Sequence, residues 1–238
     1  MFSISSYNVA EGGEEIFYPS RIQDTIDKGN PDILCIQEDF GITGFPYSIQ
    51  LPSVPGVYKN TIYSHYPILD ANIAPFVLCM INNEIVAIAN VHFNDVPYQP
   101  FQYHGIPYGG FGKLDCDTHQ QCQRELYEHA LNSRGHELQF LLRQLGKVRY
   151  YTKHIIITGD FNEPSSHDCM FSFPCVETLE QQGFHDLMLP FDHRKTWNHP
   201  LYPERIDFIL GCNVVGISGA VGESWPSDHC MLSCTVHL

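Results

Sequence analysis

The chain has 238 residues, of which 43% are hydrophobic and 13% aromatic, and its formal net charge is −14. These values exclude an intrinsically disordered protein and are typical of a packed globular domain. We expect one domain over residues 1–238, acting as a monomer. Only 13 Lys and Arg stand against 27 acidic residues, so the chain lacks the basic stripe with which proteins commonly hold long nucleic acid duplexes.

We expect no transmembrane segment, because no apolar stretch reaches the roughly 20 residues that a membrane span needs. We also expect no signal peptide, because the first residues lack a basic region followed by a long apolar core. The nine cysteines are odd in number and scattered, mostly within apolar runs. We therefore expect free thiols and an intracellular, cytoplasmic protein, with a secreted mature form as the alternative. The segment Cys116-x-x-His119-x-x-Cys122 has the spacing of half a zinc site, but without a clear fourth ligand we favour ordinary thiols there.

The first predicted element is a strand that starts at Phe2 and ends at the polar residue Asn8. A capping box that begins at Ser20 predicts a helix, which Gly29 ends. Five short apolar runs then follow the pattern of buried strands, because they do not alternate with polar residues. They span residues 33–36, 85–91, 154–158, 206–210 and 230–236.

A second helix is predicted between about residues 121 and 145, where leucines recur on one face. Gly135 is expected to break this helix in two. Arg134 is expected on the helix surface, with substrate contact as the alternative. Strands mixed with helices along the whole chain predict an α/β (α+β) layered domain.

Polar side chains with the chemistry of metal and phosphate ligands lie at or near the ends of six predicted strands. They are Asn8, Gln37-Glu38, Asn90 with His92, Asp160 with Asn162, Asp207, and Asp228-His229. Carboxylate and amide oxygens suit Mg²⁺ or Mn²⁺ better than structural zinc. Such ions polarise a phosphoryl oxygen, while a histidine held by a carboxylate can move a proton or bind an oxyanion. These residue types predict a divalent-metal-dependent phosphoesterase.

In order and spacing, the six clusters resemble the endonuclease/exonuclease/phosphatase (DNase I-like) superfamily. The group includes pancreatic-type deoxyribonuclease, abasic-site endonucleases, neutral sphingomyelinases and inositol polyphosphate 5-phosphatases. The segments that carry the resemblance are Tyr7-Asn8-Val9, Gln37-Glu38, Asn90-Val91-His92, Gly159-Asp160-Phe161-Asn162, Arg205-Ile206-Asp207-Phe208-Ile209-Leu210 and Ser227-Asp228-His229. The resemblance implies a four-layer sandwich, in which helices flank two packed mixed β-sheets.

The resemblance also implies roles for these residues. Glu38 is the expected principal metal ligand, with Asn8 and Asp228 nearby. Asp160 is expected to position or deprotonate the attacking water, and Asn162 to hold that water and the phosphate.

Two histidines complete the catalytic set that the resemblance implies. His229, oriented by Asp207, is expected to meet the phosphoryl oxygens or to transfer a proton, and His92 is the second phosphate-facing histidine. In pancreatic-type nucleases that second histidine has a carboxylate partner from an earlier strand. Here the comparable stretch offers Asn60, and an amide raises an imidazole pKa less than a carboxylate does.

The expected substrate-binding residues are Asn60, Asn90, Tyr98 and Tyr103. The last two belong to segment 93–112, which is rich in Tyr, Phe, Pro and Gly and is expected to be an irregular loop over the site. Its aromatic rings would stack on a base, contact a lipid, or pack on one another as a lid.

We expect a phosphodiesterase that acts on nucleic acid or nucleotide substrates. The alternative is a small-molecule or lipid phosphoesterase, either sphingomyelinase-like or inositol-phosphatase-like. The acidic charge of the chain favours this alternative. A catalytically silent binding module is a remote third possibility, which the complete set of polar clusters disfavours.

Overall fold

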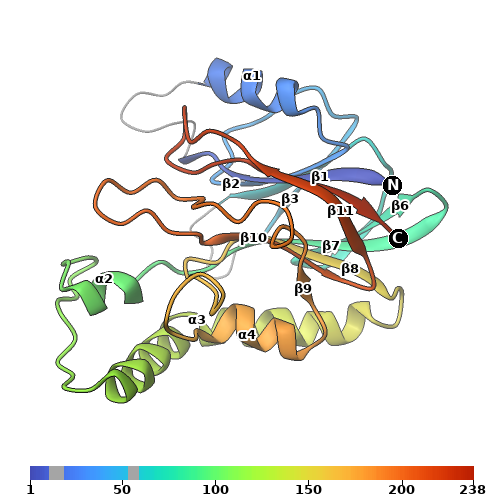
Figure 1. Ribbon diagram of the computed structural model, residues 1–238. Coiled ribbons are helices and arrows are strands. Elements are labelled where there is room, and N and C mark those ends of the chain that lie inside the picture. The colour runs from blue at the N-terminus through green and yellow to red at the C-terminus, as the bar shows by residue number, and fades with distance from the viewer. Residues whose placement is uncertain (11–18, 53–58) are drawn as a thin grey trace.

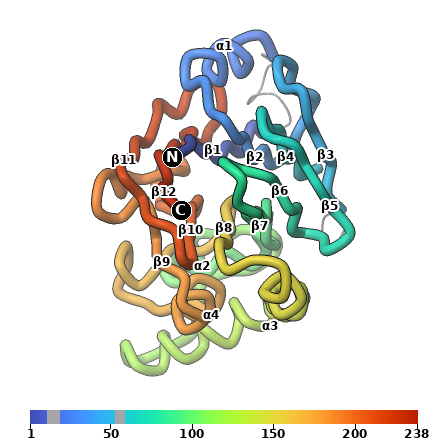
Figure 2. The backbone as a smooth tube through the Cα atoms, turned by 90° about the vertical axis from the view of Figure 1, so that its right-hand side faces the viewer, coloured from blue at the N-terminus to red at the C-terminus, as the bar shows by residue number. Residues whose placement is uncertain are grey.

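The computed structural model describes residues 1–10, 19–52 and 59–238. Two six-stranded β-sheets pack face to face, and helices cover the outer faces of the pair (Figure 1). Helix α1 lies on one side of the sheets, and α3 and α4 lie on the other, as Figure 2 shows from a second direction. This is the four-layer arrangement that the resemblance implied.

The first sheet contains both ends of the chain, and its central strands β1 and β2 are parallel. In spatial order it consists of β11 (Val215–Val221), β12 (Leu232–His237), β1 (Phe2–Asn8), β2 (Ile33–Gln37), β4 (Asn60–Ser64) and β3 (Tyr47–Leu51). Parallel pairing brings the carboxyl ends of β1 and β2 to the same edge, where Asn8 pairs in register with Gln37.

The second sheet repeats this arrangement, with β7 and β8 as its central parallel pair. In spatial order it consists of β5 (Ile68–Ile73), β6 (Phe76–Ile81), β7 (Glu84–His92), β8 (His154–Asp160), β10 (Asp207–Cys212) and β9 (His185–Asp186). In register, Asp160 lies between His92 on one neighbouring strand and Asp207 on the other. Three predicted site residues are therefore placed side by side by strand pairing alone.

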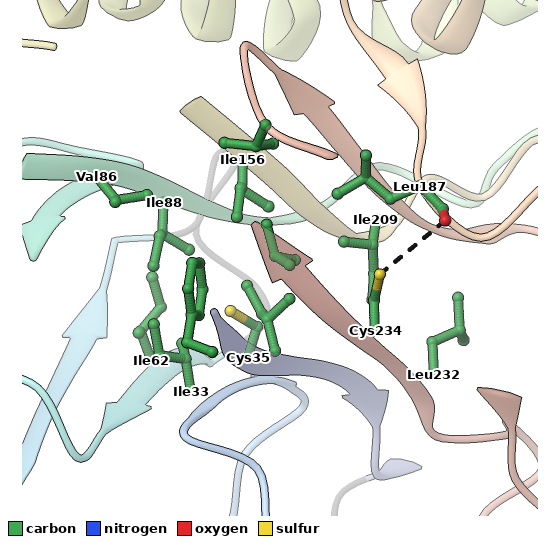
Figure 3. Packing of buried hydrophobic residues seen from close by; sticks show 14 of the residues in the cluster. Ile33, Cys35, Ile62, Val86, Ile88, Ile156, Leu187, Ile209, Leu232 and Cys234 are labelled. Atoms are coloured by element: carbon green, nitrogen blue, oxygen red, sulfur yellow. Dashed lines mark hydrogen bonds between the residues drawn. The ribbon is translucent and has the colours of Figure 1, made fainter. Parts of the chain in front are cut away.

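The space between the sheets is filled by aliphatic side chains from both (Figure 3). Ile33 and Ile62 come from the first sheet, whereas Ile88, Ile156 and Ile209 come from the second. Each such side chain contributes about 1.5–3 kcal/mol when it is fully buried. Because helices cover the other face of the central strands, β2, β7 and β8 are apolar over most of their length, as their sequence predicted.

The described residues form four helices, two of which, α1 and α3, carry the main packing surfaces against the sheets. These helices are α1 (Pro19–Gly29), α2 (Gln99–His104), α3 (His119–Val148) and α4 (Pro174–Gln181). Ile22 and Ile26 of α1 pack on the first sheet. Leu138 and Leu141 of α3 pack on the second sheet. Among the described residues, no helix is both long enough and apolar enough to cross a bilayer.

Three expectations about the segment before and within α3 were wrong. The helix runs unbroken through Gly135, because the buried leucines that follow hold it against the sheet and offset the cost of about 1 kcal/mol that glycine brings to a helix. Arg134 is fully buried rather than exposed. Segment 93–112 is not wholly irregular, since it contains α2.

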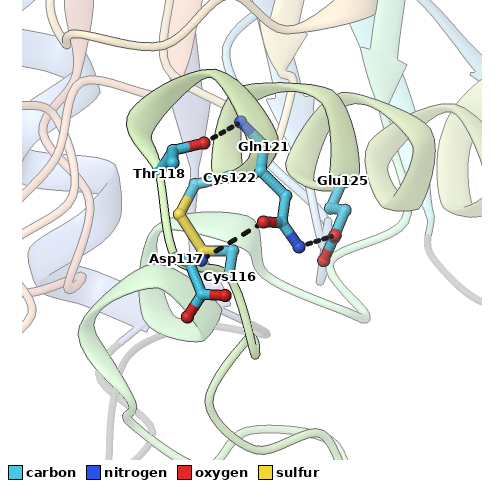
Figure 4. Close-up of a disulfide and its surroundings, with 6 residues drawn as sticks. All are labelled: Cys116, Asp117, Thr118, Gln121, Cys122 and Glu125. Atoms are coloured by element: carbon cyan, nitrogen blue, oxygen red, sulfur yellow. Dashed lines mark hydrogen bonds between the residues drawn. A yellow bond between two sulfur atoms is a disulfide. The ribbon is translucent and has the colours of Figure 1, made fainter.

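The predicted free thiols and the zinc alternative at residues 116–122 are both corrected by the structure. Cys116 and Cys122 form a disulfide at the start of α3 (Figure 4), so neither offers a thiolate to a metal. Thr118 caps the same helix by accepting a hydrogen bond from the Gln121 backbone N–H. The other seven cysteines are free thiols.

Candidate active site

The candidate active site lies where the carboxyl ends of the two parallel strand pairs meet. Asn8 and Glu38 come from the ends of β1 and β2 in the first sheet, while His92 and Asp160 end β7 and β8 in the second. His229 precedes β12 and reaches the same place from the loop before it. Residues separated by more than 200 positions therefore share one site because of the sheet order.

The carboxylate of Asp160 is the centre of this site. Its Oδ2 atom lies 3.0 Å from Asn8 Nδ2, 3.5 Å from His92 Nε2 and 3.7 Å from His229 Nε2. Glu38 joins the same group, because its Oε1 lies 3.3 Å from Asn8 Nδ2 and 4.0 Å from His92 Nε2. The two imidazoles thus flank one carboxylate oxygen, and a second carboxylate lies beside them.

The backbone around Asp160 has conformations that few residues adopt. Gly159 has φ +138°, and a Cβ atom there would lie 1.9 Å from the Val91 carbonyl oxygen, so only glycine fits before the site carboxylate. Asn162 has φ +51° and Glu38 has φ +58°, in the left-handed region that is uncommon for residues other than glycine. Such conformations cluster at functional sites.

Asn162 holds Asp160 rather than pointing into the centre. Its backbone N–H donates to Asp160 Oδ1 at 2.9 Å, and its side-chain amide donates to the Phe93 carbonyl at 2.8 Å. The amide therefore ties the loop after β8 to the end of β7. We place Asn162 among the residues that orient the carboxylate, whereas the sequence predicted direct contact with water and phosphate.

His229 and Asp207 form a buried pair next to this centre. His229 Nδ1 lies 2.9 Å from Asp207 Oδ2, and both residues are almost fully buried. The backbone N–H of Asp207 donates to Thr196 Oγ1, and that of His229 donates to Ser227 Oγ. These contacts fix the imidazole so that its other nitrogen, Nε2, faces Asp160.

The buried charges give the two histidines opposite protonation preferences. At His229, burial disfavours the charged ring, but the carboxylates of Asp207, Asp160 and Asp228 outweigh it and raise the pKa. At His92, burial and the positive charge of His229 lower the pKa to about 3. At neutral pH the site therefore contains one imidazolium and one neutral imidazole.

The acidic residues have the chemistry to bind a divalent cation. Carboxylate oxygens of Asp160 and Asp207 lie within 4.8 Å of each other. Burial and the charge of Asp207 raise the pKa of Asp160, and a nearby cation would stabilise its ionised form. Glu38, whose side chain is 20% exposed, supplies a further oxygen. This donor set fits a hard cation such as Mg²⁺ or Mn²⁺.

Two predicted metal ligands are engaged differently from the expectation. The Asn8 amide donates to the carboxylates of Glu38 and Asp160, and its oxygen accepts from the Ala10 N–H. Asn8 therefore contributes a hydrogen-bond donor to the centre in this structure. Asp228 lies at its edge, where Oδ2 accepts a hydrogen bond of 2.9 Å from the indole N–H of Trp197.

Two of the predicted substrate-binding residues are wrongly assigned, because their groups are buried in contacts with the protein. Asn90 donates to the Ile36 and Thr61 carbonyls and accepts from Gln37, so it links the two sheets. Tyr98 is only 2% exposed.

The aromatic residues of segment 93–112 pack on one another and on neighbouring loops. Tyr98 meets Phe101 and Trp197 with ring centroids 4.9 and 5.4 Å apart. Tyr103 packs on Phe171 at 4.7 Å. Of the three possibilities for this segment, the self-packed lid matches these contacts.

Asn60 is buried, and it lines one small cavity together with His92. Glu137 of α3 lines the same cavity, and no role was expected for this residue from the sequence. The signal that could have found it is its place within the apolar stripe of α3, next to Leu138.

A second buried network supports the loops of the site. The Arg134 guanidinium donates to Glu163 at 3.0 Å, to the Asn94 carbonyl at 3.0 Å and to the Gln99 side chain. Glu163 in turn accepts from the Cys175 backbone N–H near the start of α4. Arg134 thus connects the segment after His92 with the segment after Asn162, and it has no exposed surface for substrate contact.

The sequence model of the Endonuclease/Exonuclease/phosphatase family matches residues 5–229. The chain belongs to this family. Comparison with the curated protein sequences gives no match.

Solved structures show the same fold over the whole chain. A 3′ phosphatase from Neisseria, NExo, bound to a product DNA hairpin, is 15% identical with a TM-score of 0.63, and the match covers 100% of both chains. A functionally unknown conserved protein from Enterococcus faecalis is 17% identical with a TM-score of 0.65, over 99% of each chain. A humanized D. rerio TDP2 is 14% identical with a TM-score of 0.61, over 100% of this chain and 99% of the other.

Proposed function

We propose that this protein is a divalent-metal-dependent phosphodiesterase that hydrolyses nucleic acid or nucleotide substrates by attack of water on phosphorus. The observation that carries the proposal is the position of Asp160 Oδ2, which has His92 Nε2 on one side and His229 Nε2 on the other, with Glu38 adjacent. A phosphoryl group bound next to this oxygen would meet the N–H donors of both histidines and a carboxylate. Family membership and the DNA bound to the Neisseria structure support the nucleic acid substrate.

In this mechanism the two histidines bind the phosphoryl oxygens. His229 is held in its charged form by Asp207 and stabilises the negative charge that develops on those oxygens. His92 is neutral, and the proximity of Nε2 to two carboxylates favours the tautomer with its proton on Nε2. It donates this hydrogen without adding charge.

Asp160 orients the attacking water and accepts its proton. The raised pKa of this buried carboxylate makes it a better base than an exposed aspartate. Asn162 and Asn8 fix its two oxygens. A divalent ion held by Glu38, Asp228 and the central carboxylates supplies Lewis acidity to the phosphoryl and leaving oxygens when it is bound.

The test is a panel of phosphoesters incubated with Mg²⁺ or Mn²⁺. It contains single-stranded, duplex and abasic DNA, RNA, nucleotides, bis(p-nitrophenyl) phosphate, sphingomyelin vesicles and inositol phosphates. Asp160→Asn, which keeps the side-chain size and removes the base, is the blank. We expect turnover of nucleic acid or nucleotide phosphodiesters that EDTA abolishes.

A small-molecule or lipid phosphoester is the second candidate substrate. The net charge of −14 favours it, because a strongly acidic chain attracts polyanions poorly. The aromatic residues of segment 93–112 also favour it, because rings that pack on one another are not free to stack on a base. Turnover confined to sphingomyelin or inositol phosphates would move the assignment to this candidate. Absence of turnover across the panel would contradict the phosphoesterase proposal itself.

A further inference from the structure

A small cavity is lined by residues from the end of β7, including His92, from the start of β4 and from α3. It leaves about 30 Å³ for the centres of water molecules, whereas one water needs roughly 10–15 Å³ by the same measure. Its lining is partly polar and partly apolar. The lining includes Asn60, Asn90 and His92 from the strands, and Glu137, Phe140 and Leu141 from α3.

Two acceptor atoms at this cavity are buried and unsatisfied. Glu137 is 6% exposed and Asn60 is 3% exposed. The Oε1 atom of Glu137 and the Oδ1 atom of Asn60 have no hydrogen-bond partner among the described residues. An unpaired buried acceptor destabilises the folded protein, and most such groups in proteins bind an ordered water when there is space for one.

The other groups on the cavity wall leave few donors to satisfy these atoms. Glu137 Oε2 accepts from the Asn94 backbone N–H at 3.0 Å. Both amide hydrogens of Asn90 are used by backbone carbonyls. A carboxyl group that keeps its proton on Oε1 supplies the missing donor.

We propose that Glu137 in its neutral form donates to a buried water, which donates to Asn60 Oδ1 and turns its second hydrogen toward the His92 imidazole. Glu137 is then a positioning residue of the active site that acts through this water. The inference rests on the proposed function for its catalytic part, but the water site stands on the cavity and its unpaired atoms.

The charges around Glu137 agree with a neutral carboxyl group. Burial is the main effect, and together with Asp95 it outweighs the Asn94 N–H and the Arg134 guanidinium, so that the pKa of Glu137 rises to about 7. His92 is the titratable group on the strand side of the cavity. Below about pH 7 the donor is present, and above it ionisation removes the donor.

The variants that test the proposal differ in their ability to donate. Glu137→Gln keeps an oxygen for the Asn94 N–H and places an N–H where the carboxyl proton was, at all pH values. Glu137→Leu removes both the acceptor oxygen and the donor. Glu128→Gln makes the same chemical change at an exposed position of α3 and is the matched control.

The first readout does not depend on activity. A crystal structure at about pH 6 is expected to show a water within hydrogen-bond distance of Glu137 Oε1 and Asn60 Oδ1. Carbon-13 NMR of protein with labelled glutamate is expected to show one carboxyl signal that titrates near neutral pH. This signal is assigned to Glu137 because it is absent from the spectrum of Glu137→Gln. A dry cavity, or titration at the ordinary glutamate pKa, would overturn the water site.

The second readout is the pH dependence of kcat for bis(p-nitrophenyl) phosphate. The wild type and Glu128→Gln should lose activity as pH rises through about 7, whereas Glu137→Gln should lack this step and keep its rate within about twofold at pH 6. Glu137→Leu should be slower by roughly tenfold.

An unchanged pH profile in Glu137→Gln would overturn the positioning role. If the water is observed and Glu137 titrates near neutral pH, but no phosphoester is hydrolysed, then the proposed function fails while the water site stands.

Discussion

The pairing of His229 with Asp207 gives the sharpest quantitative prediction of the proposed mechanism. Asp207→Asn keeps the side-chain size but removes the negative charge 2.9 Å from His229 Nδ1. A hydrogen bond to a charged group contributes about 1.5–3 kcal/mol. Here the Asp207 carboxylate stabilises the His229 imidazolium, which in turn stabilises the transition state. We expect kcat/KM to fall by roughly 10- to 150-fold.

The assay for this prediction is a double-mutant cycle. The values of kcat/KM for Asp207→Asn, His229→Gln and the double variant are compared with that of the wild type, on bis(p-nitrophenyl) phosphate with saturating Mg²⁺. If the two residues act as one unit, the double variant is no slower than His229→Gln alone. The pairing role is refuted if the two single losses multiply in the double variant.

Three further predictions concern stability. Arg134→Met leaves the Glu163 carboxylate buried without its cation, so the free energy of unfolding in urea should fall by about 3–5 kcal/mol; a similar loss in the exposed Arg143→Met would count against the buried network. Gly159→Ala should destabilise the fold by at least ~3 kcal/mol, because its Cβ would meet the Val91 carbonyl at φ +138°; an unchanged melting temperature would contradict the tight approach. The pKa of Glu137 is raised on folding to about 7, so its stabilising contribution is full below its unfolded pKa and is lost as pH rises through about 7. Wild type should therefore lose on the order of 2 kcal/mol relative to Glu137→Gln between about pH 5 and pH 9, and parallel stability curves would refute the shift.

The layered α/β class and the polar strand ends could be predicted from local sequence patterns, whereas the four-layer sandwich was implied by the resemblance to the family. Unbroken apolar runs mark strands that are covered on both faces. A polar residue at the carboxyl end of such a run, such as Asn8 or Asp160, lies at the edge where parallel strands end together. The register that pairs His92 with Asp160 then follows from the sheet order.

The surrounding side chains could not be predicted in the same way, because their roles depend on contacts between distant segments. The pattern around Tyr98 does not distinguish a ring that faces a base from one that packs on Trp197. The spacing of Cys116 and Cys122 suits a metal site as well as the disulfide that forms.

Arg134 and Glu137 show a different limit of the sequence pattern. Both lie on the same face of α3 as Leu138 and Leu141, so helical spacing indicates their burial. Their partners are on other elements and cannot be inferred from spacing.

The measurement that tests the account most directly is a crystal structure with Mn²⁺ and inorganic phosphate. We predict the ion on the Glu38 carboxylate and a phosphate whose oxygens accept hydrogen bonds from both His92 Nε2 and His229 Nε2, beside Asp160. A phosphate bound elsewhere, or one that reaches only one of the two imidazoles while Glu38 holds no ion, would contradict the claim that these strand ends form a single phosphoryl-binding centre.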